Sequence, residues 1–293
     1  MLARIKKVFA LVFISILRYF IIKLLAVGSM AKTLPTFSES FLLVKKRPAL
    51  KNPILLAGLP GVGFVSKLAV DHLVHETGAQ RIATLYSPHF PNQVLAMKSG
   101  RLRLFSIGVY AKKMKSRDFI FVRGDLQPLT VEGQFEVTGK LLDFARQLGC
   151  IEVIAMAGYA TNSKRDKPKI YCSATNKKFF ERMLSLGAEN AQQVVPIIGM
   201  AGLIPGLAKL YGLKGCCLLV ETSGSNMDSN GAKALLELIS KIAGQKFDYK
   251  HLEQRVKKAE KMFRKIEKQA AAPTLQPPAL PEAVEKDVLR YIR

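Results

Sequence analysis

Four short segments of this chain carry residue types that could bind an anion or transfer a proton. Each follows an apolar run, at a place where glycine permits a tight turn and a carboxylate or amide can face solvent. The segments are Gly58-Leu59-Pro60-Gly61-Val62-Gly63, Gly124-Asp125-Leu126-Gln127-Pro128, Gly158-Tyr159-Ala160-Thr161 and Glu221-Thr222-Ser223-Gly224. Because ligands of open α/β sheets bind beyond the carboxyl ends of the strands, we expect these segments to border one crevice.

The candidate crevice contains two carboxylates but no further catalytic group. We expect it to be lined by Gly58, Gly61, Gly63, Asp125, Gln127, Gly158, Glu221 and Thr222. Asp125 and Glu221 could act as acid and base or hold a metal, but acids at strand ends more often cap neighbouring helices and turns. No recognisable motif places a histidine or a nucleophilic serine beside them. We therefore name no catalytic residue and favour a structural or binding role.

The glycine segment departs from the known nucleotide-binding motifs. A helix that starts there offers N–H groups to an anion. However, Lys67 stands four residues after Gly63 instead of next to it, and Ser66 occupies the third glycine position of the dinucleotide fingerprint. A structural turn or a contact with something other than a nucleotide is favoured.

The cysteines and histidines show no metal-ligand spacing. The four cysteines include no C-x-x-C pair, and the four histidines do not cluster with them. Cys216 and Cys217 lie inside an apolar run, where cysteine behaves as a small buried side chain. We expect no metal, no cofactor and no disulfide framework, which fits a reducing, cytoplasmic compartment.

The elements around these segments predict an α/β fold with a mainly parallel sheet, because short apolar runs alternate with longer helical patterns. Several of the runs are apolar at consecutive positions, as strands covered on both faces must be. The expected strands are Ile54–Ala57, Arg81–Tyr86, Leu102–Val109, Phe119–Val122, Glu152–Ala157, Val194–Ile198 and Cys216–Val220. The expected helices are Val62–Glu76, Val131–Leu148, Lys177–Leu186, Leu203–Leu210 and Gly231–Ala243.

The N-terminal segment, residues 1–29, is hydrophobic and basic. Basic residues precede an apolar stretch at 8–27 that resembles a transmembrane helix or a signal peptide, although Arg18 and Lys23 interrupt it. The positive-inside rule would then place the rest of the protein outside the cell, against the cytoplasmic interpretation. The favoured explanation is translation from Met30, with a membrane anchor or a cleaved signal left open.

Beyond the α/β domain, which we place at 30–247, the sequence predicts an amphipathic helix at 248–269 and a Pro-rich linker and tail at 270–293. The helix has the a/d spacing of a short coiled-coil seam, formed by Leu252, Val256, Ala259, Phe263, Ile266 and Ala270. It either lies on its own domain or joins an oligomer.

The chain is strongly basic, with 45 Lys and Arg against 22 Asp and Glu and a net charge of +23. Partners selected by charge would be acidic: nucleic acid, anionic lipid or an acidic protein surface. The two basic clusters are Lys112, Lys113, Lys115 and Arg117, and Lys164, Arg165, Lys167 and Lys169. Neither cluster interleaves aromatic residues as a single-strand binder does, so nucleic acid is disfavoured.

Five stretches between about Ile54 and Lys261 form a series with a specific order and spacing. They are Gly58–Gly63 with Lys67-Leu68-Ala69-Val70-Asp71, Gly124–Pro128, Gly199-Met200-Ala201-Gly202-Leu203-Ile204-Pro205-Gly206-Leu207-Ala208-Lys209-Leu210, Leu218–Gly224 with Asp228 and Ala232, and Phe247-Asp248-Tyr249 with Leu252-Glu253. This series resembles the proteasome assembly chaperone family, the archaeal and bacterial relatives of the second eukaryotic chaperone of that kind.

The resemblance implies a three-layer α/β/α sandwich, similar to the nucleoside-phosphorylase type, followed by a C-terminal helix and a flexible tail. It implies a non-enzymatic, self-associating protein that binds the core proteasome or its α subunits. Some members end in a docking signature of hydrophobic residue, tyrosine and any residue, and this chain places its tyrosine one position early. The candidate docking residues are Leu289, Tyr291, Ile292 and Arg293.

The alternative to a chaperone is an enzyme of the phosphorylase or ATP-dependent ligase kind. It would use Gly58–Gly63 to hold phosphate and Asp125 or Glu221 as its carboxylate.

Overall fold

The computed structural model describes residues 37–161, 166–191, 193, 196–224, 227–257 and 260–261. The chain separates into two units, residues 1–39 and 40–293. All the described helices and strands belong to the second unit. The N-terminal segment, the linker and the candidate docking tail lie outside the described residues.

Within the described residues, nine strands form one sheet in the order β1-β3-β6-β7-β2-β8-β11-β9-β10. They are β1 (Phe41–Val44), β2 (Ile54–Gly58), β3 (Gln80–Tyr86), β6 (Ile107–Lys112), β7 (Phe119–Gly124), β8 (Glu152–Ala160), β9 (Ile170–Ala174), β10 (Glu189–Asn190) and β11 (Lys214–Thr222). The central strands β7, β2, β8 and β11 are parallel. β1, β3 and β6 on one side and β9 on the other join antiparallel, and β10 pairs parallel with β9.

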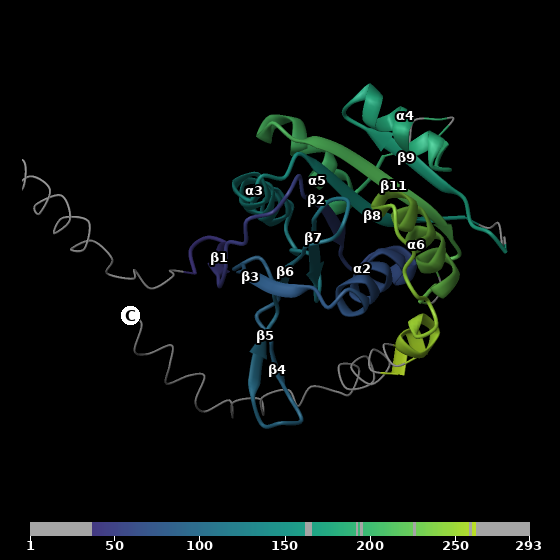
Figure 1. Ribbon diagram of the computed structural model, residues 1–293. Helices are drawn as coiled ribbons and strands as arrows, with labels where there is room; N and C mark the ends of the chain where they lie inside the picture. The colour runs from purple at the N-terminus through teal and green to yellow at the C-terminus, as the bar shows by residue number, and fades with distance from the viewer. Residues whose placement is uncertain are drawn as a thin grey trace, which may run out of the picture. The chain divides into compact units, whose positions relative to one another are not determined.

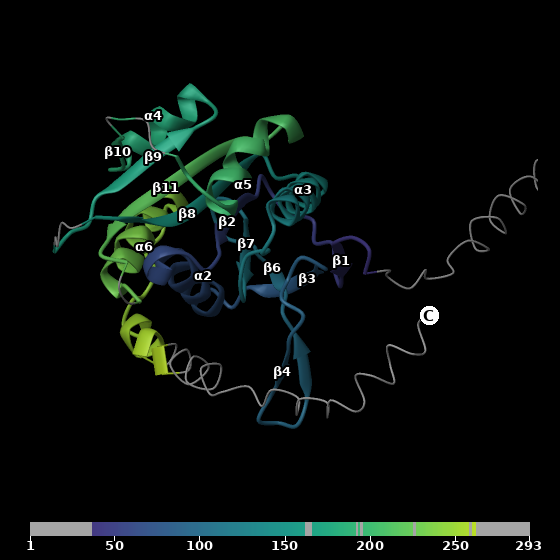
Figure 2. The same cartoon turned by 180° about the vertical axis from the view of Figure 1, so that it is seen from behind.

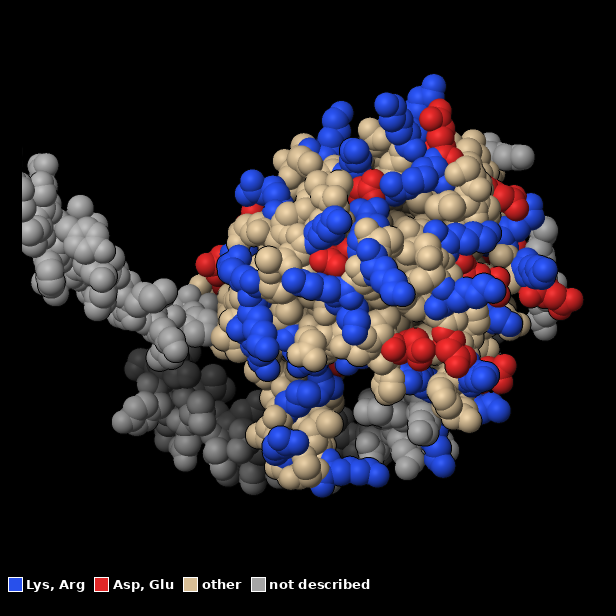
Figure 3. Space-filling view, viewed as in Figure 1, with Lys and Arg blue, Asp and Glu red and all other residues tan. Residues whose placement is uncertain are grey.

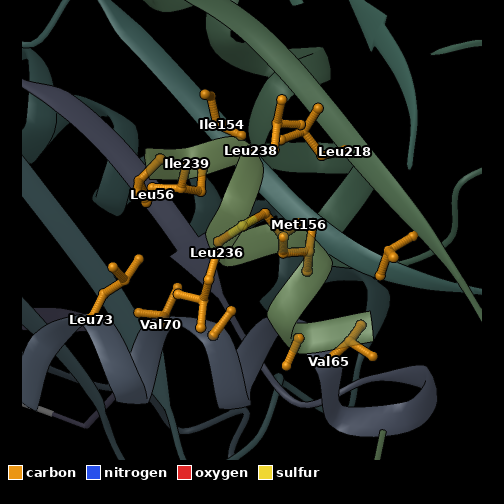
Figure 4. Packing of buried hydrophobic residues seen from close by; sticks show 14 of the residues in the cluster. Leu56, Val65, Val70, Leu73, Ile154, Met156, Leu218, Leu236, Leu238 and Ile239 are labelled. Carbon is orange, nitrogen blue, oxygen red and sulfur yellow. The ribbon is translucent and has the colours of Figure 1, made fainter. Parts of the chain in front are cut away.

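Helices cover both faces of this sheet, which confirms the expected α/β/α fold (Figures 1 and 2). On one face α2 (Val65–Glu76), α4 (Lys177–Ser185) and α6 (Ser229–Ala243) pack on Leu56, Ile154 and Leu218. Figure 4 shows α2 and α6 side chains meeting those of the strands in this layer. On the other face α3 (Val131–Gln147) and α5 (Met200–Ala208) pack on Leu55 and neighbouring residues.

The central strands alternate their side chains between these two apolar layers. In β2, Ile54 and Leu56 belong to the layer under α2 and α6, whereas Leu55 and Ala57 belong to the layer under α3 and α5. All five residues of β2 are buried. This double coverage explains why the central strands are apolar at consecutive positions.

Three of the helices begin at residues of the types that commonly cap helix N-termini. The side chains of Thr130, Asn176 and Asp228 accept backbone N–H groups at the starts of α3, α4 and α6. α2 differs, because it follows a short 3-10 turn, η1 (Val62–Phe64), and its preceding residue Phe64 has a left-handed φ of 54°. The single helix expected at Val62–Glu76 is therefore broken after Phe64.

The expected strand Leu102–Val109 is two strands that belong to different sheets. β5 (Leu102–Leu104) pairs with β4 (Val94–Ala96) in a separate two-stranded hairpin, and β6 begins only at Ile107. The break falls at Phe105 and Ser106, where the Ser106 N–H donates to the Asp125 carboxylate. In Figure 1 the hairpin projects away from the nine-stranded sheet.

The strand expected at Val194–Ile198 is wrong for the residues that the structure describes there, because Pro196, Ile197 and Ile198 form no strand. Pro196 cannot donate to a ladder. These residues instead line a cavity beside α5. The strands missing from the expectation are β1, β4, β9 and β10, of which all but β9 are four residues or shorter.

After α6 the chain returns across α2. Residues 252–257 are helical, and Leu252 and Val256 are buried in the layer under α2 and α6. The described part of the amphipathic helix thus lies on its own domain. Ala259, Phe263, Ile266 and Ala270 of the expected seam lie outside the described residues.

Candidate functional site

The glycine segment turns directly from β2 into η1 and α2, and the protein's own atoms fill the space beside it. A Cβ at Gly58 would lie 2.2 Å from the Ser66 carbonyl oxygen, and one at Gly158 would lie 2.3 Å from the Val62 carbonyl oxygen. Gly63 has a φ of 64° and packs against the Thr222 side chain. These glycines let the η1–α2 segment approach the ends of β2, β8 and β11 closely, which explains their residue type without a bound phosphate.

Gly61 is the exception in this segment, because it is exposed and a Cβ there would meet nothing within 4 Å. Its φ is −167°, an extended conformation that any residue adopts. The structure therefore gives no packing reason for glycine at this position.

Gln127 bridges the glycine segment to the start of α5. Its Nε2 donates to the Pro60 carbonyl oxygen at 2.8 Å, and its Oε1 accepts from the Met200 N–H at 2.9 Å. This side chain thus satisfies one of the N–H groups that the first turn of a helix leaves unpaired. Gln127 also fixes the spacing between the glycine segment and the start of α5. Its side chain borders a cavity.

This cavity has a volume of about 230 Å³ and lies between the glycine segment, the end of β8 and the start of α5. Its lining is mostly apolar, and includes Leu59, Val62, Met156, Ile197, Met200 and Ile204. The Ser66 hydroxyl also faces it but donates to the Leu59 carbonyl oxygen at 2.8 Å. The cavity suits an apolar group, and its described lining contains no Asp, Glu, His, Lys or Arg.

The two candidate carboxylates lie apart. Asp125 follows β7 and Glu221 is in β11, and β2 and β8 run between these strands. Three strand spacings of about 4.8 Å put them roughly 14 Å apart across the sheet. The structure therefore does not bring Asp125 and Glu221 together as an acid–base pair or a shared metal site.

Each of these carboxylates is held by its own partners. Asp125 pairs with Arg103 of β5 and accepts the Ser106 N–H, so it anchors the β4–β5 hairpin. Glu221 is buried and accepts the Tyr171 hydroxyl at 3.0 Å and the Lys169 N–H at 3.1 Å, both from the β9 side. Burial raises the pKa of Tyr171, and its hydrogen bond to Glu221 acts in the same direction.

A second cavity, of about 520 Å³, adjoins the first and shares Tyr159 and Leu219 with it. Its described lining adds Lys169, Tyr171, Glu189 and Asn190, so it is more polar. Sequence reasoning missed this part of the site because β9 was not expected. The alternation of Ile170 and Cys172, which are buried, with Tyr171 and Ser173 was the available signal.

The described residues contain no group of histidine, cysteine and acidic side chains that could hold a metal ion. The four cysteines are buried and unpaired, all of them within the described residues. Burial raises the pKa of Cys150 and Cys172 to about 11, so these thiols stay protonated at neutral pH. Among the helices of the described residues, none is long and apolar enough to cross a membrane.

The basic clusters are partly engaged within the protein. Arg117 donates to the buried carboxylate of Glu152 at 2.8 Å, and Lys169 pairs with Glu189 at 2.7 Å. Lys164 and Arg165 lie outside the described residues. Lys and Arg side chains are nonetheless spread over the face shown in Figure 3.

Comparisons with known proteins agree with this α/β/α fold and its motifs. The model of the PAC2 family matches residues 55–270. An uncharacterized protein of Methanocaldococcus jannaschii is 32% identical over 253 residues, which cover 85% of this chain and 95% of that protein. The chain therefore belongs to the PAC2 family, which confirms the resemblance drawn from its motifs.

Two solved structures from Pyrococcus furiosus are similar to this chain. PbaB, described as an archaeal proteasome activator, is 37% identical with a TM-score of 0.70, over 78% of this chain and 99% of that one. PbaA, described as an archaeal homolog of proteasome-assembly chaperone, is 24% identical with a TM-score of 0.66, over 78% of this chain and 97% of that one. At that identity, PbaA supports the fold alone.

Proposed function

We propose that this protein is a proteasome assembly chaperone or proteasome-binding factor that acts by binding and carries out no chemistry. Its membership of the PAC2 family and its 37% identity with PbaB across nearly all of that chain carry the proposal. The protein would work in the cytoplasm, and residues 8–27 would anchor it to a membrane only if the N-terminal segment is translated.

The geometry of the crevice supports a non-enzymatic role. Asp125 and Glu221 are separated and each is held by its own partners, and the space beside Gly58, Gly63 and Gly158 is filled by the protein itself. A phosphorylase or a ligase needs an open anion site with a carboxylate or base beside it. The cavity beside Gln127 is instead lined mostly by apolar side chains.

The proposed partner is the core proteasome or its α subunits, and a second copy of the chain joins the working oligomer. The tail residues Leu289, Tyr291, Ile292 and Arg293 would occupy a pocket between subunits of the partner. The Pro-rich linker at 270–281 would span about 35 Å when extended, enough to reach a neighbouring ring.

Co-elution of the full chain with the core proteasome of the same organism tests this function. We expect a stable complex, and we expect its loss when Tyr291–Arg293 are removed. If co-elution survives this truncation, the contact lies in the folded domain and not in the tail. That result would favour a role in assembling the proteasome over a role in activating it. If neither version binds mature or half-assembled particles, the proposed function is wrong.

A further inference from the structure

The β4–β5 hairpin carries an apolar face that the described residues leave uncovered. Its register pairs Val94 with Leu104 and Ala96 with Leu102, and side chains of paired residues lie on the same face of a ribbon. These four residues are all exposed, Leu102 to 75%. Leu95 and Arg103 form the other face.

This ribbon gains little support from the rest of the fold. A two-stranded hairpin alone is marginally stable in water, and an apolar face on it should be exposed only if something else covers it. Its tip is closed by the Met97 N–H donating to the Arg101 carbonyl oxygen, with Gly100 in the left-handed region. The hairpin is therefore ordered locally, and no other part of the described chain covers its apolar face.

The base of the hairpin is fixed to the sheet by Asp125. This carboxylate pairs with Arg103 in β5 and accepts the Ser106 N–H at 3.2 Å, and its own N–H donates to the Ser106 carbonyl oxygen. These contacts join β5 to the end of β7. The apolar face is thus presented at a defined place instead of on a loose loop.

The charge of the hairpin indicates the chemistry of what covers it. Lys98 and Arg101 are exposed at its tip, and the sequence has no Asp or Glu from Thr77 to Arg117. A second copy would bring another basic hairpin to a chain that already carries +23, so charge opposes self-pairing at this place. An acidic surface is complementary in charge to the basic tip of the hairpin.

A protein suits this ribbon better than a lipid bilayer does. Both edges of a two-stranded ribbon carry unpaired backbone N–H and C=O groups, which hydrocarbon cannot satisfy but a strand or side chains of a protein can. We propose that the β4–β5 hairpin is a docking arm that places its apolar face in an acidic-rimmed groove of the partner protein. The inference rests on the proposed function, with the core proteasome as the partner to be tested.

The test measures the affinity of the full chain for the core proteasome. Leu102→Ser/Leu104→Ser removes the apolar face, and Lys98→Glu/Arg101→Glu reverses the charge of the tip. We expect each double variant to bind about tenfold more weakly or worse, as loss of central interface residues does. The charge variant should also lose most of the salt dependence of the association rate.

Matched controls change the same kinds of side chain elsewhere. Ile151→Ser alters an exposed apolar residue before β8, and Lys178→Glu/Lys214→Glu reverses two exposed charges on α4 and β11. Both should bind within about twofold of the wild type, because substitutions outside the contact leave affinity nearly unchanged.

Four results would overturn the docking arm. The first is wild-type affinity in both hairpin variants. The second is a fall of more than about 5 °C in the Tm of Leu102→Ser/Leu104→Ser, which would mean that the chain's own residues cover the face. The third is a change of native mass, which would assign the face to a second copy. The fourth is that the hairpin variants lose binding to phosphatidylserine vesicles but keep their affinity for the proteasome. A wild type that does not bind the proteasome at all would instead reject the proposed function.

Discussion

At the scale of single residues, Glu152 gathers two arginines at the end of the parallel strands opposite to the crevice. Glu152, the first residue of β8, is 5% exposed and receives Arg117 at 2.8 Å and Arg182 at 3.0 and 2.9 Å. Burial alone would raise the pKa of Glu152, but the hydrogen bonds and charges of Arg182 and Arg117 hold it below its ordinary value. This cluster ties the segment before β7, the start of β8 and α4 together.

The variant Glu152→Gln should lower the free energy of unfolding by about 2 kcal/mol at pH 7, because it leaves two arginines without their buried carboxylate. The folded pKa of Glu152 is depressed, so its contribution is present above the unfolded pKa and is lost as pH falls through the folded value. Urea unfolding at several pH values should show the gap between wild type and variant narrowing toward acid. The control Glu189→Gln, in an exposed pair with Lys169, should cost less than about 0.5 kcal/mol.

At the scale of elements, the described residues after α6 are held against α2 through two histidines. His72 is buried in α2 and its Nε2 lies 2.6 Å from the Asp248 carbonyl oxygen, while His75 Nδ1 lies 2.6 Å from Arg255. The His72 Nδ1 has no hydrogen-bond partner among the described residues. Burial lowers the pKa of His72, and Arg255 lowers it further, against the opposing effects of the Asp248 carbonyl and Glu76.

Acid should loosen this contact. Since the folded pKa of His72 lies below its unfolded value of about 6.5, the unfolded state takes up the proton first, and the stabilisation present above that value is lost as pH falls below it. Hydrogen exchange, corrected for intrinsic rates, should show lower protection of residues 249–257 at pH 5 than at pH 7. The variant His72→Leu should remove this pH dependence and cost about 1 kcal/mol for the lost hydrogen bond. Equal protection at both pH values in the wild type would contradict the prediction.

The sequence predicted these elements unevenly, for physical reasons. Strands buried on both faces, such as β2 and β7, were found because their apolar runs are continuous. β9 and the hairpin were missed or merged because long-range contacts define them, such as Asp125 with Ser106. In the candidate site, Gly58 ends β2 and Gln127 follows β7, whereas Gly158 and Glu221, which were expected just after strands, lie inside β8 and β11. The separation of Asp125 from Glu221 depends on strand order, which no local pattern specifies.

At the scale of the whole molecule, the α3–α5 layer carries exposed apolar side chains of its own. Leu129, Val131 and Phe135 are exposed around the start of α3, and Leu210 is exposed to 79% in η2 (Lys209–Tyr211) after α5. Gly139 allows Tyr211 to pack close against α3, which brings these two regions together. Soluble monomers rarely expose apolar clusters of this kind, so this layer is our candidate for contact between copies of the chain.

The variant Phe135→Glu/Leu210→Glu should therefore lower the native mass of the protein in light scattering, because two carboxylates would lose hydration in the contact between copies. Both side chains are exposed within one chain, so far-ultraviolet circular dichroism and the Tm of the single chain should stay close to those of the wild type. Leu102→Ser/Leu104→Ser is the matched control, since the hairpin is assigned to a different partner, and it should keep the wild-type mass.

Two results would show that the α3–α5 layer is not the contact between copies. One is a wild type that is monomeric at tens of micromolar, and the other is an unchanged native mass in the Phe135→Glu/Leu210→Glu variant. The docking arm and the self-association layer thus predict opposite results for the same pair of variants, so one set of proteins measured for mass and for proteasome affinity tests both.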